Sequence, residues 1–545
     1  MHKNDSKPKL FARFIRDRYT SSPADSDLSS AQPYNKELAI AFLVFILISA
    51  LCVFFAAFSS PFFRYSTNSD SNVYFSVARA MQNGLLPYRD VFDHKGVFLY
   101  LIYYVAVWMT PTNMNGVYIL LTISSAVTML YGFRLARLFL PSIPAMISAL
   151  SIILFSMGSP VYENGGGSTE EFFMPCIMAC LFYLVRHQIH LHGKIVLSGV
   201  ERFSGAFIGG IFCAVILWVK YSSLAVLFIP YLIFVTDMLF RKQIRETATY
   251  IGSFLMGAAA LSVIPISYLW RHELFADFWN TYIVFNLDYA SSETAFNIAT
   301  FLQMMLLAAL IPTTYTLLGM GYLSKKVKVV PCRCFWLVAS HALSLIFFIV
   351  ALKKAFPYYF LLFAPMTVFG SVAIAYGIRR YSDAINRQSI SRNRHIILAL
   401  ISIMLLIGIV IAFSSTRWRL GSVVFPQTSV EKSASSVNDY WAVNGDGSAP
   451  DIVHFACNDK GLYELCHTYP QQLYFYQPYI EGEAAMSILR EQAQYIREGR
   501  VDFVVYYSKS DERIDLESLN SDYFLLYEDV TPSDSNFFSF VYAKK

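Results

Sequence analysis

The sequence predicts an all-α polytopic membrane protein that ends in a small α/β domain outside the bilayer. Its composition is the first observation: 55% of the 545 residues are hydrophobic and only 15% are charged, and the mean hydropathy is +0.44. Soluble globular chains are less apolar and carry more charge. The second observation is a set of roughly eleven apolar stretches of membrane-spanning character. The third is a polar, turn-rich composition beyond residue 414.

The apolar stretches follow a basic amino-terminal segment, residues 1–36, which we expect to be disordered and cytoplasmic. No small-residue cleavage site follows the first stretch, so we expect it to stay in the chain as an anchor. The predicted spans run from Ala39 to Phe58, Met114 to Phe133, Ile143 to Met157, Phe172 to Val185, Phe203 to Val219, Leu224 to Phe240, Tyr250 to Trp270, Phe301 to Leu318, Phe335 to Leu352, Tyr358 to Ile378 and Ile396 to Phe413.

A shorter apolar stretch, Val97 to Met109, decides the orientation of everything after it. It is too short for a comfortable crossing, and we expect it to lie at the interface. If it does not cross, the basic clusters between the later spans fall on the cytoplasmic side, whereas most of them invert if it does. The positive-inside bias therefore places the loops 59–113 and 158–171 of the membrane domain (residues 37–414) outside a plasma membrane.

Residues 415–545 form the predicted extracytoplasmic α/β domain. Runs of β-prone residues surround one helical pattern there, as expected for a small mixed domain. The β-prone runs are Ile452–Ala456, Phe503–Tyr507, Tyr523–Glu528 and Phe538–Ala543, and the helical pattern is Met486–Arg497.

Charge and cysteine usage exclude other classes of function. The net charge is only +5, and the basic residues are scattered between apolar runs, so we expect no nucleic-acid partner. Cys332 and Cys334 have no second pair nearby, which disfavours a zinc site. In the polar tail, Cys457 and Cys466 are able to form a disulfide, and the sequence leaves that pairing open. The other four cysteines lie in apolar runs and are expected to pack as small hydrophobes.

Charged side chains gather in the first external loop, directly beside the bilayer. The phosphate of a lipid-linked sugar lies at this depth. An enzyme that uses such a donor needs fixed cations there and a carboxylate slightly further out. Lys95 and Arg89 are the candidate phosphate ligands. Asp70 is the candidate general base on an acceptor hydroxyl.

A second carboxylate is available from the second external loop, at the start of the fourth predicted span. Glu170 and Glu171 lie there, after three glycines that permit tight turns. Such a carboxylate near Asp70 would raise its pKa, orient the acceptor, or help to hold a divalent cation. The residues do not decide between Glu170 and Glu171, and no metal ligand set is predicted.

The external loops contain three short motifs: an early acid followed by an aromatic helix (Asp70, Tyr74), a G-x-x-P-Y-x-D stretch that contains Tyr88, and the run Asp93-His94-Lys95-Gly96. In these motifs the chain resembles the GT-C superfamily of glycosyltransferases that use polyprenyl-phosphate sugars, which includes protein O-mannosyltransferases and lipid A aminoarabinose transferases. The resemblance implies a GT-C-like fold and an inverting transfer. It also implies that Tyr74, Tyr88, Asp93 and His94 belong to the donor site beside Lys95 and Arg89.

Structural roles compete with these assignments. Asp70 is also a plausible N-cap of the helix that follows it, and Glu170 has the same alternative at the fourth span. Lys95 is a candidate for snorkelling at the membrane surface. For His94, a bonded interfacial residue is favoured over a catalytic one.

The predicted function is therefore transfer of a sugar from a polyprenyl-phosphate carrier to a glycan, glycolipid or protein of the cell envelope. The alternative is a transporter or flippase for lipid-linked sugars, which would place ionisable residues in the middle of the membrane. The predicted spans contain almost none; Asp237, for example, is close to a span end. An assembly protein that has kept the fold without activity is the third hypothesis.

Overall fold

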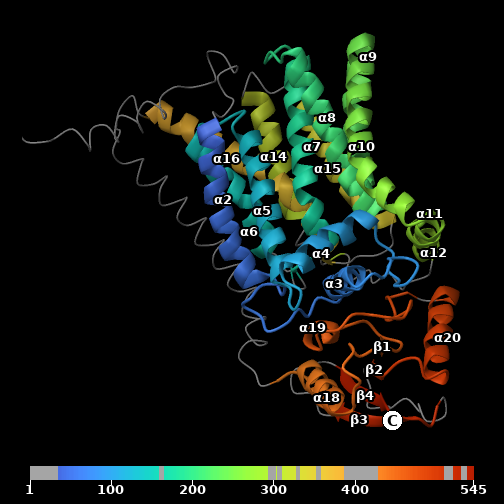
Figure 1. Ribbon diagram of the computed structural model, residues 1–545. Helices are drawn as coiled ribbons and strands as arrows, with labels where there is room; N and C mark the ends of the chain where they lie inside the picture. The colour runs from blue at the N-terminus through green and yellow to red at the C-terminus, as the bar shows by residue number, and fades with distance from the viewer. Residues whose placement is uncertain are drawn as a thin grey trace, which may run out of the picture.

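The computed structural model contains a helical bundle, a group of loops at one end of it, and a carboxyl-terminal domain packed on those loops (Figure 1). The described residues are 35–158, 162, 165–291, 302, 310–326, 332–351, 357–385, 427–480, 482–508, 520–529 and 537–545.

The bundle is built from apolar helices that run between its two ends. Its members are α2 (Asn35–Ala56), α5 (Asn115–Ala136), α6 (Ser142–Gly158), α7 (Thr169–Leu191), α8 (Gly199–Lys220), α9 (Ala225–Phe240), α10 (Ile244–Arg271), α14 (Ile311–Lys326), α15 (Cys332–Ala351) and α16 (Thr367–Ile385), with the 3-10 helix η6 (Pro357–Met366) before α16. Three short elements follow α10 at the end that carries the loops: α11 (Phe275–Phe278), the π-helix η4 (Trp279–Val284) and α12 (Phe285–Ser291).

Within the described residues, seven helical stretches are long and apolar enough to cross a membrane. One of them, Gly199–Phe240, comprises α8 and α9, which are joined by the 3-10 turn η3 (Tyr221–Leu224). The chain reverses direction at this turn, because His187 at the end of α7 contacts both Arg202 near the start of α8 and Phe234 near the end of α9.

The polytopic helical architecture is thus confirmed, whereas the number of eleven spans stays a prediction. The predicted span Ile396–Phe413 lies outside the described residues, and Phe301–Leu318 lies only partly within them.

The short apolar helix α4 (Val97–Met109) lies across one end of the bundle (Figure 1). Just before it, the backbone N–H of Gly96 donates to Val219 at the end of α8 (3.0 Å). Just after it, the N–H of Met114 donates to Glu464 of the carboxyl-terminal domain (3.2 Å). Both ends of α4 therefore lie on the same face, as predicted for a helix that does not cross.

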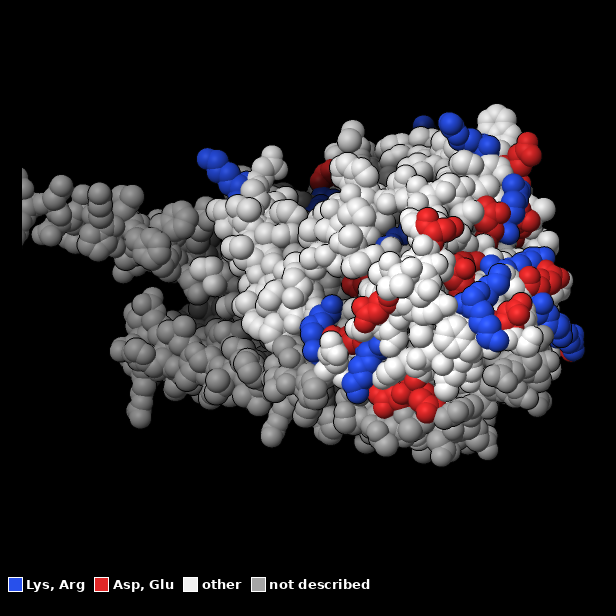
Figure 2. Space-filling model, turned by 60° about the horizontal axis from the view of Figure 1, so that its bottom comes forward, with Lys and Arg blue, Asp and Glu red and all other residues white. Residues whose placement is uncertain are grey.

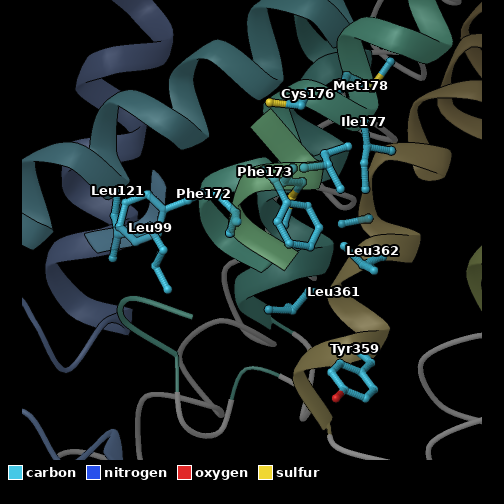
Figure 3. Close-up of a cluster of buried hydrophobic side chains, with 14 of the residues drawn as sticks. Leu99, Leu121, Phe172, Phe173, Cys176, Ile177, Met178, Tyr359, Leu361 and Leu362 are labelled. Carbon is cyan, nitrogen blue, oxygen red and sulfur yellow. The ribbon is translucent and has the colours of Figure 1, made fainter. Parts of the chain in front are cut away.

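The helix α7 forms the centre of the bundle, and its residues from Thr169 to Ile189 are all buried. Figure 3 shows Phe173 and Ile177 of α7 on the side of Leu361 and Leu362 of η6, and Phe172 on the side of Leu99 and Leu121. Between membrane helices, close van der Waals packing of such side chains holds the helices together, because lipid tails are as apolar as the side chains themselves. The burial of α7 also means that its acidic first turn begins inside the protein.

The carboxyl-terminal domain contains a four-stranded sheet in the order β1-β2-β4-β3. β1 (Ile452–His454) pairs in parallel with β2 (Phe503–Ser508), and β4 (Phe538–Lys544) pairs antiparallel with β2 and with β3 (Tyr523–Asp529). Alternate residues point to opposite faces of a strand. Val504 accordingly packs with Ile496 of α20 (Glu483–Arg497). The adjacent strand residues Phe503 and Val505 instead face the side of α18 (Ser429–Asn444). The predicted α/β composition of this tail is confirmed.

Both ends of the molecule carry acidic and basic side chains. Figure 2 shows acidic and basic residues intermixed at the end that carries the carboxyl-terminal domain, while most of the visible bundle surface is uncharged. At the opposite end, arginines of the bundle form ion pairs between helices, namely Arg137–Glu37, Arg186–Glu201 and Arg202–Glu246.

The carboxyl-terminal domain is joined to the first loop by direct hydrogen bonds. Glu464 in the short helix α19 (Leu462–Leu465) accepts from the backbone N–H of Ser66 (2.9 Å) as well as from Met114. Arg79 of α3 (Ser69–Gln82) donates to the carbonyl of Tyr463 (2.9 Å). These contacts hold the domain over the segment that contains the candidate site residues.

Candidate active site

The helix α3 brings Asp70 to the end of the bundle that faces the carboxyl-terminal domain. Asn68 is the N-cap of this helix, because its side chain accepts from the backbone N–H of Ser71 (3.2 Å). Asp70 is therefore not the capping residue, although an acid in the first turn still interacts favourably with the helix dipole. Within the described residues, its carboxylate makes no hydrogen bond or ion pair, so it is available to a ligand.

Asp70 lines a cavity of about 280 Å³ between the bundle and the carboxyl-terminal domain. The first loop contributes Asp70, Tyr74, Asp93, His94 and Lys95, and the second loop contributes Gly165 and Ser168. The two loops that the sequence predicts to share one face therefore do meet. The remaining part of the wall comes from Tyr289, Tyr358 and Leu361 on the bundle side, and from Asn458, Lys460, Tyr476, Pro478 and Tyr479 of the carboxyl-terminal domain.

The charges around the cavity act on Asp70 in opposite directions. Removal from water raises the pKa of Asp70, and the negative charges of Asp93 and Glu170 raise it further. The positive charges of Lys95 and Lys220 oppose this shift. The net pKa is above the ordinary value, as expected for a carboxylate suited to accept a proton.

Asp93 has the opposite character because its oxygens are fully occupied. Tyr100 donates to one oxygen (2.8 Å), and Tyr476 of the carboxyl-terminal domain donates to the other (2.9 Å). Burial by itself raises the pKa of Asp93, but Lys95, His94 and these two hydroxyls together lower it below the ordinary value. Asp93 is thus a fixed negative charge that ties the first loop to the carboxyl-terminal domain.

Lys95 points its ammonium group toward the same cavity. Its Nζ lies 2.8 Å from Nε2 of His94 and 5.6 Å from the ring centroid of Tyr74. His94 in turn places Nδ1 3.4 Å from Asp93. The run Asp93-His94-Lys95 therefore forms one connected group, in which the cation at its end is the part available to a phosphate.

Tyr88 and Arg89 do not line the cavity, although the sequence assigns them to the donor site. The buried Tyr88 donates its hydroxyl to the backbone carbonyl of Lys95 (2.8 Å) and so fixes the position of that residue. Arg89 makes an ion pair with Asp277 of α11 (2.9 Å) and donates to the carbonyl of Glu273 (2.6 Å). Tyr88 thus holds the first loop together internally, and Arg89 holds this loop against the segment after α10.

The two adjacent acids at the start of α7 have different partners. Glu170 is fully buried and makes an ion pair with Lys220 at the end of α8 (2.7 Å). The ammonium of Lys220 also lies 4.2 Å from the ring centroid of Tyr359 and 5.6 Å from that of Tyr358, which lines the cavity. Glu170 and Lys220 together therefore form a charged layer directly behind the cavity wall.

Glu171 is instead the third residue of a capping box. Its Oε2 accepts from the backbone N–H groups of Gly166 (3.1 Å), Gly167 (2.9 Å) and Ser168 (2.8 Å), and Oε1 accepts from Tyr162 (2.5 Å). Both glycines have φ of +126°, a conformation that side chains with a Cβ avoid. The glycine run and Glu171 thus form the turn that presents α7.

Sequence reasoning did not single out the carboxyl-terminal residues of the cavity. Asn458, Lys460 and Tyr476 lie more than 350 residues after Lys95 in the chain, and no local pattern marks them. Their only signal is a concentration of tyrosines between residues 463 and 479, which is also typical of an ordinary domain core.

The described residues contain no group of three or more His, Cys, Asp or Glu side chains arranged to hold a metal ion. Cys457 and Cys466, the candidate disulfide pair, are both free thiols in this structure. The thiol of Cys457 lies 3.7 Å from the carbonyl of Val505 in β2.

Comparison with known proteins reveals a likeness in structure alone. No protein-family model and no curated protein matches the sequence. Similar solved structures include two of ArnT from Cupriavidus metallidurans. The apo structure has a TM-score of 0.59 at 13% identity and covers 93% of this chain and 98% of its own. The structure bound to undecaprenyl phosphate has a TM-score of 0.57 at 12% identity and covers 94% of this chain and 98% of its own. The chain thus has the fold of ArnT over nearly its whole length.

Proposed function

We propose that this chain is a membrane glycosyltransferase that moves a sugar from a polyprenyl-phosphate carrier to an acceptor on the outer face of the plasma membrane. The observation that carries the proposal is the meeting of Asp70 and Lys95 in one cavity at the end of the bundle. A base and a cation in this arrangement suit an acceptor hydroxyl and a donor phosphate. The likeness to ArnT bound to undecaprenyl phosphate supports the class of carrier.

In the proposed reaction, the carboxylate of Asp70 accepts the proton of an acceptor hydroxyl while that oxygen attacks the anomeric carbon of the sugar. The bond from the anomeric carbon to the phosphate oxygen breaks, and its electron pair leaves with the polyprenyl phosphate. Attack opposite to the leaving group inverts the anomeric centre. Lys95 stabilises the negative charge that develops on the phosphate.

The neighbouring residues have positioning roles in this proposal. Glu170 holds Lys220 against Tyr358 and Tyr359 in the wall of the cavity. Tyr88 fixes the backbone of Lys95, and Arg89 anchors the loop to Asp277. Of the two acids in the second loop, we therefore assign Glu170 to the site and Glu171 to the capping of α7.

The acceptor is proposed to be a glycan, glycolipid or protein of the envelope that enters between the bundle and the carboxyl-terminal domain. Asn458 and Lys460 are the polar side chains that it would meet on that side. On the donor side, Lys95 supplies positive charge for the donor phosphate.

The test is a transfer assay with purified protein and radiolabelled polyprenyl-phosphate sugars. Loss of the base is expected to lower transfer by about 10²–10⁴-fold in Asp70→Asn, and Lys95→Ala is expected to lower it as well. The matched control is Asp439→Asn, since Asp439 is an exposed acid of α18 outside the cavity. Wild-type rates in Asp70→Asn, or movement of the intact carrier across the bilayer without cleavage, would contradict the proposal.

A further inference from the structure

A second cavity lies at the other end of the bundle, far from Asp70. It has a volume of about 330 Å³ and is bounded by the end of α7, the start of α8, the end of α9 and the start of α10. Figure 1 shows that the ends of α8 and α9 that bound this cavity lie on the side opposite to the carboxyl-terminal domain. The cavity shares no residue with the candidate active site.

The inner part of this cavity is apolar. The buried side chains of Phe234, Met238 and Tyr250 line it, and Phe203, which is 42% exposed, also lines the cavity. His187 also lines it, but its two ring nitrogens already lie 2.7 Å from the carbonyl of Tyr183 and 3.3 Å from that of Arg202. The ring of His187 is packed edge-on against Phe234 and Tyr250. An apolar chain is therefore better suited to this inner part than a polar group.

The rim of the cavity is cationic. Arg202 makes an ion pair with Glu246 (2.7 Å), yet its Nε is buried without a hydrogen-bond partner among the described residues. Arg245 is exposed, and its guanidinium has no hydrogen bond or ion pair within the described part of the chain. At neutral pH the two arginines and Glu246 leave one net positive charge at the rim. His190 also lines the cavity, with Nδ1 held by Ile195 and Leu197.

Exposed apolar side chains lie around the rim, beside the exposed cations Arg241 and Lys242. Val200 (77% exposed), Phe240 (83%) and Ile244 (71%) lie at the ends of the helices that form the cavity. In a chain that crosses a membrane, such side chains face the acyl chains of the bilayer. The arginines then lie at the depth of the lipid headgroups. Basic pockets between membrane helices at this depth bind anionic lipid headgroups.

We propose that this cavity binds an anionic phospholipid of the surrounding bilayer. Its phosphate lies between Arg202 and Arg245, and part of one acyl chain lies along Phe203 and Met238. Phosphate pairs with guanidinium groups by charge-assisted hydrogen bonds. A bound lipid would bridge α8 and α10, the helix pair whose other end carries Lys220. The site is separate from the glycosyl-transfer site, so binding is measurable without turnover.

The test uses the full-length protein in neutral detergent and measures thermal unfolding and lipid retention by native mass spectrometry. Phosphatidylglycerol is expected to raise the midpoint of unfolding by about 3 °C, whereas phosphatidylcholine with the same acyl chains is not. Inorganic phosphate is the third arm, because it offers the same charge without the apolar chain. The variants are Arg245→Gln, in which no folded contact is lost, and Arg202→Gln/Arg245→Gln.

Both variants are expected to lose the selective stabilisation by phosphatidylglycerol. The matched control is Arg271→Gln, which removes an exposed arginine at the opposite end of α10 and is expected to keep it. Equal stabilisation of the wild type and the double variant would overturn the site. Equal stabilisation by inorganic phosphate and by phosphatidylglycerol would overturn the assignment to a lipid.

Discussion

Acidic residues that look alike in the sequence have different roles in the structure. Asp70 and Glu171 both lie in the first turn of a helix. Glu171 is saturated by backbone N–H donors, whereas Asn68 caps the helix of Asp70 and leaves its carboxylate in the cavity. The sequence shows an acid in the first turn of each helix but does not show which role each acid has. The choice between cap and base depends on which neighbours fold onto each carboxylate.

The pKa of Asp70 leads to a prediction about pH dependence. A general base works only when ionised, so the proposed transfer falls as the pH falls through the raised pKa of Asp70. We expect the acid limb of kcat/KM above the range of an ordinary aspartate, whose pKa is about 3.9. Glu170→Gln removes a charge that raises this pKa and is expected to move the limb to lower pH.

The matched control for this profile is Glu171→Gln. Glu171 is not among the groups that shift Asp70, so the limb is expected to stay where it is in the wild type. Movement of the limb in Glu171→Gln but not in Glu170→Gln would contradict the assignment of the two acids.

Among the single elements, α4 and the end of α8 approach each other closely at Gly96. The helix α4 begins where the chain passes the end of α8, and Gly96 is the residue at that contact. A Cβ at Gly96 would lie 1.9 Å from the carbonyl oxygen of Trp218. The run Asp93-His94-Lys95-Gly96 therefore ends in glycine because α4 has to dock closely on α8 before Lys95 can face the cavity.

Gly96→Ala is expected to destabilise the folded protein by about 1–3 kcal/mol, because the new methyl group has to displace a backbone segment. Transfer activity is expected to fall with it, since Lys95 is the neighbouring residue. The matched control is Gly252→Ala in α10, where a Cβ meets no atom within 4 Å. Thermal unfolding in detergent measures both variants, and equal midpoints would refute the close packing at Gly96.

The carboxyl-terminal domain completes the candidate site at the scale of the whole molecule. It supplies part of the cavity wall and binds the first loop through Tyr476, Tyr463 and Glu464. Removal from water raises the pKa of Glu464 to about 7, although the N–H groups of Ser66 and Met114 oppose the shift. Burial likewise raises the pKa of Asp451 in this domain to about 7.

These two carboxyl groups predict that stability falls as the pH rises. Between the ordinary values near 4 and about 7, the folded protein binds protons that the unfolded chain has released. Their contribution is therefore present at low pH and lost as the pH passes about 7. We expect a lower unfolding midpoint at pH 8 than at pH 5.5. Glu464→Gln and Asp451→Asn are each expected to reduce that difference, and an unchanged difference in both would contradict the prediction.

The orientation of the molecule is testable by cysteine labelling in intact cells. Thr112 lies in the exposed turn between α4 and α5, on the face of the candidate site, whereas Lys194 lies in the exposed turn between α7 and α8 at the other end. In a Cys332→Ser background, an impermeant reagent is expected to label Thr112→Cys and not Lys194→Cys. The reverse pattern would place the cavity in the cytoplasm and exclude an envelope acceptor.

Local sequence was enough to predict the polytopic helical class, a helix at Val97–Met109 that does not cross the bundle, the α/β tail and the grouping of Asp70 with Lys95. These follow from local composition and periodicity, which are properties of neighbouring residues. The folded structure was needed to show that Glu171 caps α7, that Arg89 pairs with Asp277, and that Tyr476 and Lys460 belong to the cavity. Such pairings join residues far apart in the chain. Packing of helices and domains selects them, and no local pattern records that choice.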